Sequence, residues 1–229
     1  MIVRSEIVGR ATLYLGDAYA ILPTLGWFDV VCTDPPYAFE TSGGGKFRAA
    51  RRHTDQIACE DLDQGFDHLI INPLLCGSVV VFCHNDQVPE LSTYLSGSFE
   101  RFAICNWIKS NPMPVANKHY QPDCEIYIHA WNRGHHPQGE LADKRRHIVA
   151  PVGRRGAFGH PTVKPDAVMD KIVRNLAPGS ICDPFMGTGS TGVAAVKTGR
   201  KFVGIEHNPA HFATACQRLA SAQKLLGEG

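Results

Sequence analysis

The sequence is short of the patterns that mark disulfide-rich and metal-binding proteins. Its eight cysteines form no CxxC pair and follow no regular spacing. Several lie inside apolar runs, as Cys32 and Cys83 do, where cysteine behaves as a small buried hydrophobe. We therefore expect neither a disulfide framework nor a zinc site, and we expect a protein of the reducing cytoplasm.

Membrane and secretion signals are also missing. No apolar stretch approaches the roughly 20 residues that a membrane-spanning helix needs. The first residues, Met1 to Ile7, carry charges of both signs and no long apolar core, so we do not expect a signal peptide. The formal net charge is only +1, so any attraction for a polyanion must come from how the charges are distributed.

What the sequence does have is a regular alternation of strand-like and helix-like segments. It predicts a single α/β domain with a doubly wound, mostly parallel, Rossmann-like sheet. Two irregular segments, 38–58 and about 110–160, are where function could be added to this scaffold. The expected strands are 12–15, 28–33, 78–82, 102–109, 125–131, 180–183 and 201–206, and the expected helices are 18–25, 62–75, 85–95, 163–176, 188–197 and 209–226.

One motif follows directly on the strand expected at 28–33, namely Asp34-Pro35-Pro36-Tyr37. Two prolines cannot continue the hydrogen-bond ladder, so the chain must leave the sheet there. An amino group between the Asp34 carboxylate and the Pro35 carbonyl would find two acceptors, and the Tyr37 ring could lie against a flat partner. The motif therefore indicates a site for an aromatic amine, although a rigid turn after the strand would explain the prolines equally well.

A second motif, Asp183-Pro184-Phe185-Met186-Gly187-Thr188-Gly189, follows the strand expected at 180–183 and precedes an expected helix. Glycines there let the backbone approach a ligand, and the helix start offers free N–H groups. Glu206 ends the next strand, where an acid can accept hydrogen bonds from ribose hydroxyls. The motif is neither GxGxxG nor a P-loop, so phosphate binding is not indicated. A packing turn would explain the glycines but not the two acids.

Together these motifs resemble the amino-methylating DNA methyltransferases that use S-adenosylmethionine. Asp183 to Gly189 resembles their cofactor loop and Asp34 to Tyr37 their catalytic loop, while 160–165 (His-Pro-Thr-Val-Lys-Pro), 107–114, 125–129 and 16–18 resemble further family segments. The resemblance implies catalytic residues Asp34, Pro35, Pro36 and Tyr37. It implies cofactor-binding residues Asp17, Asp34, His160, Thr162, Lys164, Asp183, Pro184, Phe185, Gly187, Thr188, Gly189, Ser190, Glu206, His207 and Asn208.

The order of the two loops along the chain indicates which class of this family the sequence resembles. The catalytic loop at 34 precedes the cofactor loop at 183, which resembles the circularly permuted β class of the family. That class places its target-recognition segment between them, which here means about 110–160. The segment is shorter than is common in the family, so a short target, relaxed specificity or help from a partner subunit would each fit.

The resemblance implies methyl transfer to the exocyclic amino group of an extruded base, with Tyr37 stacked on it. Asp rather than Ser before Pro-Pro-Tyr favours N6 of adenine. The alternatives are an N4-cytosine enzyme and a catalytically silent DNA-binding partner subunit, against which the intact motifs speak. Methylation of RNA or protein is disfavoured by the order of the motifs.

Double-stranded DNA is the expected partner, with a homodimer left open, and neither a metal nor a membrane is expected. A bacterial or phage-encoded cytoplasmic enzyme follows from the resemblance. Basic clusters near the motifs would hold DNA phosphates, although each could equally be a solvated loop. His135 and His136 fit a polar loop better than a metal site. The expected DNA contacts are Lys46, Arg48, Arg51, Arg52, Lys144, Arg145, Arg146, Arg154 and Arg155.

Overall fold

The computed structural model describes residues 1–37, 65–114, 120–153 and 163–227. Its strands are β1 (Ile2–Val8), β2 (Ala11–Gly16), β3 (Phe28–Thr33), β4 (Cys76–Cys83), β5 (Arg101–Lys109), β6 (Cys124–Trp131), β7 (His147–Ala150), β8 (Ile181–Asp183) and β9 (Phe202–Glu206). Its α-helices are α1 (Ala18–Ile21), α3 (Val88–Ser98), α4 (Asp166–Asn175), α5 (Ser190–Lys197) and α6 (Pro209–Gly227). Short 3-10 turns lie at Leu22–Thr24, His68–Ile70 and Asn85–Gln87. Within these described ranges, no helix is long and apolar enough to span a bilayer.

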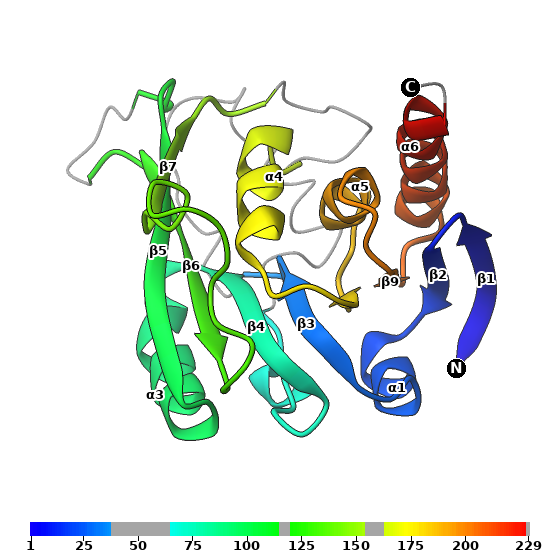
Figure 1. The fold of residues 1–229 in the computed structure, drawn as a ribbon, viewed down its shortest axis with the longest axis horizontal. Helices are drawn as coiled ribbons and strands as arrows, with labels where there is room; N and C mark the ends of the chain where they lie inside the picture. The colour runs from blue at the N-terminus through cyan, green and yellow to red at the C-terminus, as the bar shows by residue number, and fades with distance from the viewer. Residues whose placement is uncertain (38–64, 115–119, 154–162, 228–229) are drawn as a thin grey trace, which may run out of the picture.

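All of the strands belong to one sheet, in the order β1-β2-β9-β8-β3-β4-β6-β5-β7 (Figure 1). The central strands β2, β9, β8, β3 and β4 run parallel, as does the pair β5 and β7. Strand β1 and strand β6 run antiparallel to their neighbours. The expected mixed α/β fold with a large, mostly parallel sheet is therefore confirmed.

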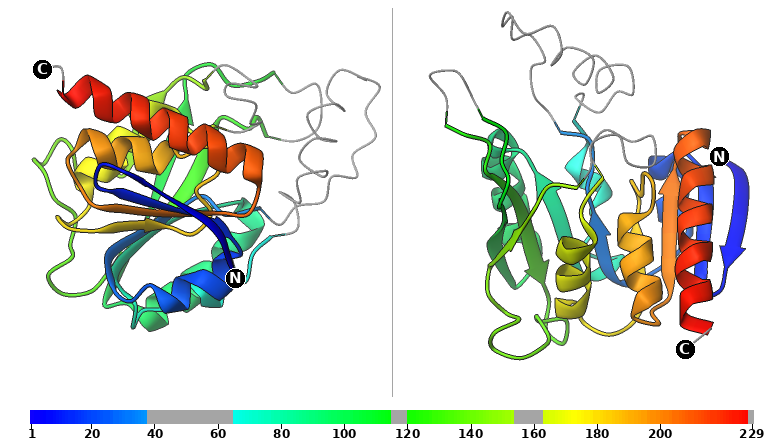
Figure 2. Two further views of the ribbon diagram at one scale, coloured as in Figure 1. Left: turned by 90° about the vertical axis from the view of Figure 1, so that its right-hand side faces the viewer. Right: turned by 90° about the horizontal axis from the view of Figure 1, so that it is seen from above.

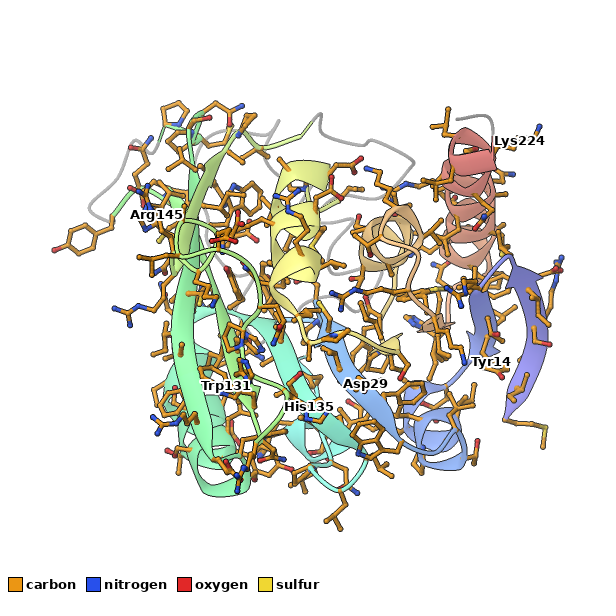
Figure 3. All side chains as sticks on the ribbon, in the orientation of Figure 1. Tyr14, Asp29, Trp131, His135, Arg145 and Lys224 are labelled. Carbon is orange, nitrogen blue, oxygen red and sulfur yellow. The ribbon has the colours of Figure 1, made fainter. Side chains whose placement is uncertain are left out.

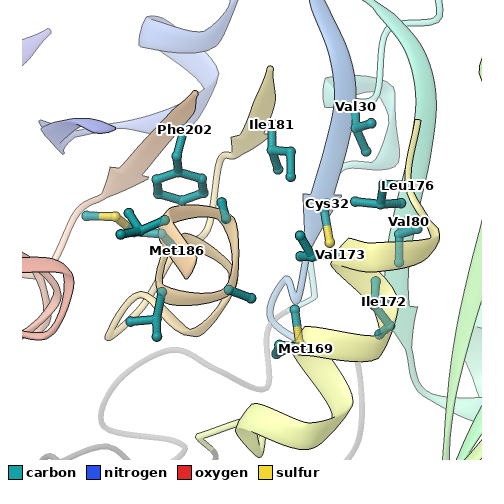
Figure 4. Packing of buried hydrophobic residues seen from close by; sticks show 14 of the residues in the cluster. Val30, Cys32, Val80, Met169, Ile172, Val173, Leu176, Ile181, Met186 and Phe202 are labelled. Atoms are coloured by element: carbon teal, nitrogen blue, oxygen red, sulfur yellow. The ribbon is translucent and has the colours of Figure 1, made fainter. Parts of the chain in front are cut away.

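Helices cover both faces of the sheet (Figure 2). Alternate residues of β3 show why both faces need cover: Val30 and Cys32 pack on the side of α4, α5 and α6, whereas Val31 packs on the side of α1 and α3. Helix α4 contributes Met169 and Ile172 to the first of these two cores (Figure 4). A strand buried on both faces reads as a continuous apolar run, which is how β3 and β4 read in the sequence.

Three elements differ from the sequence-based expectations. The expected helix 62–75 is wrong in its described part, which holds only the turn His68–Ile70. Pro73 bars a longer helix there, and Leu69 and Leu74 are exposed rather than aligned on a buried face. Strands β1 and β7 were not expected, because both lie at edges of the sheet and carry few buried residues to reveal them.

The strand order places a crevice between the carboxyl ends of β3 and β8. The chain leaves β3 for β4 on one side and leaves β8 for β9 on the other, although β3 and β8 are neighbours. Connections that depart in opposite directions open a crevice at the carboxyl ends of two adjacent parallel strands. The two Asp-Pro motifs follow these two strands, so the fold brings them side by side.

Candidate functional site

Two aspartates from distant parts of the sequence meet at the carboxyl ends of β3 and β8. Asp183 is the last residue of β8, and Asp34 comes directly after Thr33, the last residue of β3. The Thr33 hydroxyl donates a hydrogen bond to Asp183 Oδ1 over 2.8 Å, which ties the two strand ends together. The sheet therefore joins two motifs that are about 150 residues apart in the chain.

Asp34 is held by two donors. Lys164 Nζ donates to its Oδ2 over 2.5 Å, and the Tyr37 hydroxyl donates to its Oδ1 over 2.9 Å. Lys164 Nζ also lies 3.3 Å from the Tyr37 hydroxyl. Burial raises the pKa of the Tyr37 phenol well above its ordinary value, with Asp34 adding to the effect, so the hydroxyl remains a donor. The acceptor expected from the sequence is thus a partly buried carboxylate with a fixed orientation.

Lys164 has a second carboxylate partner that the sequence did not single out. Its Nζ lies 3.2 Å from Glu125 Oε2, and Lys109 Nζ lies 3.0 Å from Glu125 Oε1. Burial by itself would lower the pKa of Lys164, but Asp34 and Glu125 raise it above its ordinary value. Burial likewise raises the pKa of Asp34, against the lowering effect of Lys164. The 2.5 Å contact and the two flanking carboxylates favour the ionised pair, with Lys164 charged.

The sheet topology explains how Glu125 reaches this place. Strand β6 is antiparallel to β4 and β5, so its first residues lie beside the last residues of those strands. Lys109 ends β5 and Glu125 is the second residue of β6, which puts their side chains at the same edge. Lys164 immediately precedes Pro165, the N-cap of α4. The Phe82 ring, on β4, lies 4.7 Å from Lys164 Nζ.

The glycine turn after β8 adopts the backbone that its sequence predicts. Gly187 and Gly189 have φ angles of 53° and 84°, in the left-handed region that favours glycine. A Cβ on Gly189 would lie 2.9 Å from Leu219 Cδ1, so the turn also needs glycine for its packing. Glu206 accepts hydrogen bonds from the backbone N–H groups of Gly187 at 2.9 Å and Asn208 at 2.7 Å. This carboxylate therefore connects the loop after β9 to the glycine turn.

Among the described residues, no lysine pairs with Asp183. It accepts hydrogen bonds from the hydroxyls of Thr33 and Thr191 and, over 3.1 Å, from the Phe185 backbone N–H. Burial raises its pKa to about 7, and the nearby charge of Asp34 acts in the same direction. Its proton is therefore exchangeable near neutral pH.

A cavity of about 200 Å³ lies between the two motifs. Of the predicted cofactor residues, those on its wall are Asp34, Lys164, Asp183, Phe185, Gly187, Thr188, Ser190, Glu206, His207 and Asn208. All four predicted catalytic residues are on the wall as well. Wall residues that were not expected are Glu125, Val163, Met169, Met186, Thr191 and His211.

Other predicted residues lie elsewhere. Asp17, Pro184 and Gly189 do not line this cavity; the Asp17 carboxylate caps α1 by accepting from Tyr19 N over 3.0 Å. The predicted cofactor residues His160 and Thr162 lie outside the described residues. The whole segment 38–58 lies outside them too, and so do the predicted DNA contacts Lys46, Arg48, Arg51, Arg52, Arg154 and Arg155. No cluster of three metal-ligating side chains occurs among the residues that the structure describes.

The basic run at 144–146 lies beside the middle of β5 rather than at the edge of the sheet that holds the cavity. The Arg146 carbonyl accepts from Asn106 N over 2.8 Å, three residues before β5 ends (Figure 3 labels Arg145). His135 is also far from the cavity. It contacts Asp29, at the opposite end of β3, over 3.8 Å and packs on Trp27.

Glu125 could have been found from the sequence by one further step. If the expected strands 102–109 and 125–131 are treated as an antiparallel pair, Lys109 and Glu125 fall at the same end of it. Their opposite charges would then predict an ion pair at the edge that carries the catalytic motif.

Comparisons with known proteins agree on the kind of protein that carries this site. The model of a DNA methylase family, that of the N6/N4 methyltransferases, matches residues 28–217. The type II methyltransferase M2.LlaDCHI of Lactococcus lactis subsp. cremoris is 25% identical over 244 residues, covering 92% of this chain and 89% of its own. The crystal structure of the M1.HpyAVI–SAM complex has a TM-score of 0.65 and 27% identity, covering 91% of this chain and 100% of its own.

A more distant structure shares the fold. The PvuII DNA methyltransferase, which is cytosine-N4-specific, has a TM-score of 0.67 at 15% identity. The match covers 99% of this chain and 94% of that one. At this identity the likeness concerns the fold alone.

Proposed function

The chain belongs to the N6/N4 DNA methylase family, and from that premise we propose that it transfers a methyl group from S-adenosylmethionine to the N6 amino group of adenine in DNA. The observation that carries the proposal is the meeting of two motifs at one crevice. Asp34, a partly buried hydrogen-bond acceptor, shares a cavity wall with the glycine turn and Glu206.

The residues of the cavity fit S-adenosylmethionine. Glu206 is only 5% exposed; its Oε2 has one backbone N–H partner, which leaves a lone pair for a ribose hydroxyl, while its Oε1 has the Asn208 N–H and His207 Nδ1 at 3.2 Å. Asp183 is one of four carboxyl groups on the cavity wall, with those of Asp34, Glu125 and Glu206, and the rest of the wall is largely apolar, as expected for a ligand that carries positive charge on an apolar body. S-adenosylmethionine supplies an electrophilic methyl group when it is bound.

The mechanism then rests on positioning the amino group. Asp34 and the Pro35 carbonyl would each accept one N–H of the base, which favours a pyramidal nitrogen with a free lone pair. The fixed carboxylate stabilises the positive charge that develops on this nitrogen during transfer. The proton can leave to Asp34 afterwards, so no strong base is required beforehand. Tyr37 would contact the extruded base.

Adenine is proposed over cytosine because aspartate rather than serine precedes Pro35. An aspartate at this position can form the ion pair with Lys164 that the structure shows, which a serine cannot. A serine at this position would lack the negative charge and would leave Lys164 with Glu125 alone.

The same proposal includes an organisation for the chain. It is one methyltransferase domain over 1–229, of the permuted β class, with a target-recognition segment at about 110–160. DNA phosphates would be held by the basic residues near 46–52 and 144–155. A cytoplasmic enzyme, bacterial or phage-encoded, completes the proposal, and the homodimer stays open.

The experiment is to express the chain in a host without other DNA methylation and to analyse the modified nucleosides and their sequence context. We expect N6-methyladenine at a short recurring sequence. N4-methylcytosine would overturn the choice of base but keep the reaction class. A purified chain that binds S-adenosylmethionine but labels no DNA would overturn the proposal as a whole.

A further inference from the structure

A partly buried chain of four charged side chains begins at Asp34, and it adds two groups to the Asp34–Lys164 ion pair. The order is Asp34, Lys164, Glu125, Lys109, with successive nitrogen–oxygen distances of 2.5, 3.2 and 3.0 Å. The side chains of Lys164 and Lys109 are 7% and 15% exposed. Such a chain is costly to bury, so a role in stability alone is a poor reason for it.

Glu125 differs from Asp34 in what it can reach. Its Oε2 atom is fully buried and accepts no hydrogen bond besides its ion pair with Lys164. Its carboxylate is therefore held between two lysines, although the residue also lines the cavity. The ion pair with Lys164 is the contact through which Glu125 can act on Asp34.

The Lys164 ammonium group has two aromatic rings and two carboxylates as neighbours. The rings of Phe82 and Tyr37 lie 4.7 and 5.5 Å from its Nζ, and the carboxylates of Asp34 and Glu125 lie on either side. With Glu125 present, the ammonium group is fixed by two anions. Without it, Asp34 would be the only anion opposing the charge, and the geometry of the pair would relax.

We infer that Glu125, braced by Lys109, is a positioning residue for methyl transfer: it fixes Lys164 on Asp34 and so orients the carboxylate that receives the amino group. This inference rests on the proposed function. It adds two residues to the site, Glu125 and Lys109, and gives Lys164 a role on the acceptor side of the reaction in place of cofactor contact alone.

The test is Glu125→Gln, which keeps the shape of the side chain and removes its charge. We expect kcat to fall about 10- to 100-fold, as for loss of a charged hydrogen-bond partner, while the affinity for S-adenosylmethionine in calorimetry changes by less than about twofold. Glu6→Gln is the matched control, because Glu6 also pairs with a basic residue, Arg4, but on the exposed strand β1. It should leave both quantities unchanged.

Two further readouts separate positioning from a general loss of structure. Charged groups near Asp34 are Lys164, Glu125 and, across the crevice, Asp183, with the Tyr37 hydroxyl beside them. Removing the negative charge of Glu125 makes Asp34 easier to ionise, so the acid limb of the kcat profile should move to lower pH. In a Lys164→Met background, Glu125→Gln should cause no further loss of kcat.

Should Glu125→Gln fail to fold, Lys109→Met keeps Glu125 and removes only the outer support. It should lower kcat by about two- to fivefold without weakening cofactor binding. Equal losses from Glu125→Gln with and without Lys164, an unmoved pH profile, or a loss confined to cofactor affinity would each overturn the inference. A wild-type chain that methylates no DNA would instead overturn the proposed function.

Discussion

The two Asp-Pro motifs of this protein lie at equivalent places and have different surroundings. Asp34 follows β3 and Asp183 ends β8, and the strands are neighbours; Asp183 is buried, whereas the Asp34 side chain is 26% exposed. Asp34 has an ammonium group at 2.5 Å, whereas Asp183 has two hydroxyls and a backbone N–H. The same dipeptide in the same kind of crevice therefore carries a fixed negative charge on one side and an exchangeable proton on the other.

The difference shows that position in the fold does not determine the chemistry of a carboxylate. A cation within hydrogen-bond distance favours the charged form, whereas neutral donors offset burial only in part. The lysine that makes the difference, Lys164, immediately precedes the N-cap of α4 and pairs with the aspartate that is 130 residues away in the sequence rather than with nearby Asp183. In the proposed reaction the charged side would receive the amino group, and the side with neutral donors would belong to the cofactor.

The largest effect is expected from a substitution at Asp34, which should change methyl transfer but not cofactor binding. Asp34→Asn keeps the shape but removes the charge, so we expect methyl transfer to fall at least about 10³-fold. Cofactor affinity should change by less than about threefold, because Glu206 and the glycine turn remain. A single-turnover assay with labelled methyl donor, together with calorimetry, measures both. Methyl-transfer activity near that of the wild type would show that Asp34 does not hold the amino group and that the two aspartates do not have these separate roles.

A smaller effect concerns how stability depends on pH. The pKa of Asp183 is raised to about 7, so the folded chain holds this proton more tightly than the unfolded chain does. The stability from this group is complete below about pH 4 and is lost as the pH rises to about 7, by at most about 1.4 kcal/mol per pH unit. Urea unfolding of the wild type and of Asp183→Asn across this range measures the difference, in which contributions of other groups cancel. If the difference between them rises with pH, the assignment is wrong.

The smallest effect is expected from removing one of the uncharged hydrogen-bond donors to Asp183. Thr33→Val removes the hydroxyl that bonds Asp183 Oδ1 and leaves Asp34 with its lysine. We expect a loss of about 1–2 kcal/mol in the free energy of unfolding and a further rise in the pKa of Asp183. The pH dependence described above should then extend to higher pH, while the acid limb of kcat stays in place. Thr24→Val is a matched control, because the Thr24 hydroxyl bonds a backbone carbonyl far from either aspartate.

Much of the scaffold could be predicted because its signals are local. The apolar runs at β3, β4 and β9 and the helical spacing at α4 and α6 each lie within a short window, so the α/β alternation is visible directly. The two edge strands were missed because an exposed strand lacks the apolar run that marks a buried one. The helix expected at 62–75 failed because apolar residues at helical spacing need a face to cover, and Leu69 and Leu74 have none.

The candidate site was only partly predictable for the same kind of reason. Motif residues such as Asp34, Gly187 and Glu206 are recognisable because turn geometry and strand ends restrict which residues can stand there. Glu125 carries no such local mark, since a single acid at the start of a strand is usually exposed. Its importance arises only from the antiparallel direction of β6, which turns its first residues toward the carboxyl edge of the sheet.

The sequence by itself determined the family, the alternation of strands and helices and the two loops of the site, because these depend on residues that are close together in the chain. The tertiary structure decided which groups those loops meet. It put β3 beside β8, so that two aspartates share one crevice, and it put Lys164, Glu125 and Lys109 behind only one of them. A charge acts through space over a few ångströms, and neighbours at that distance are set by strand order and direction rather than by position in the sequence.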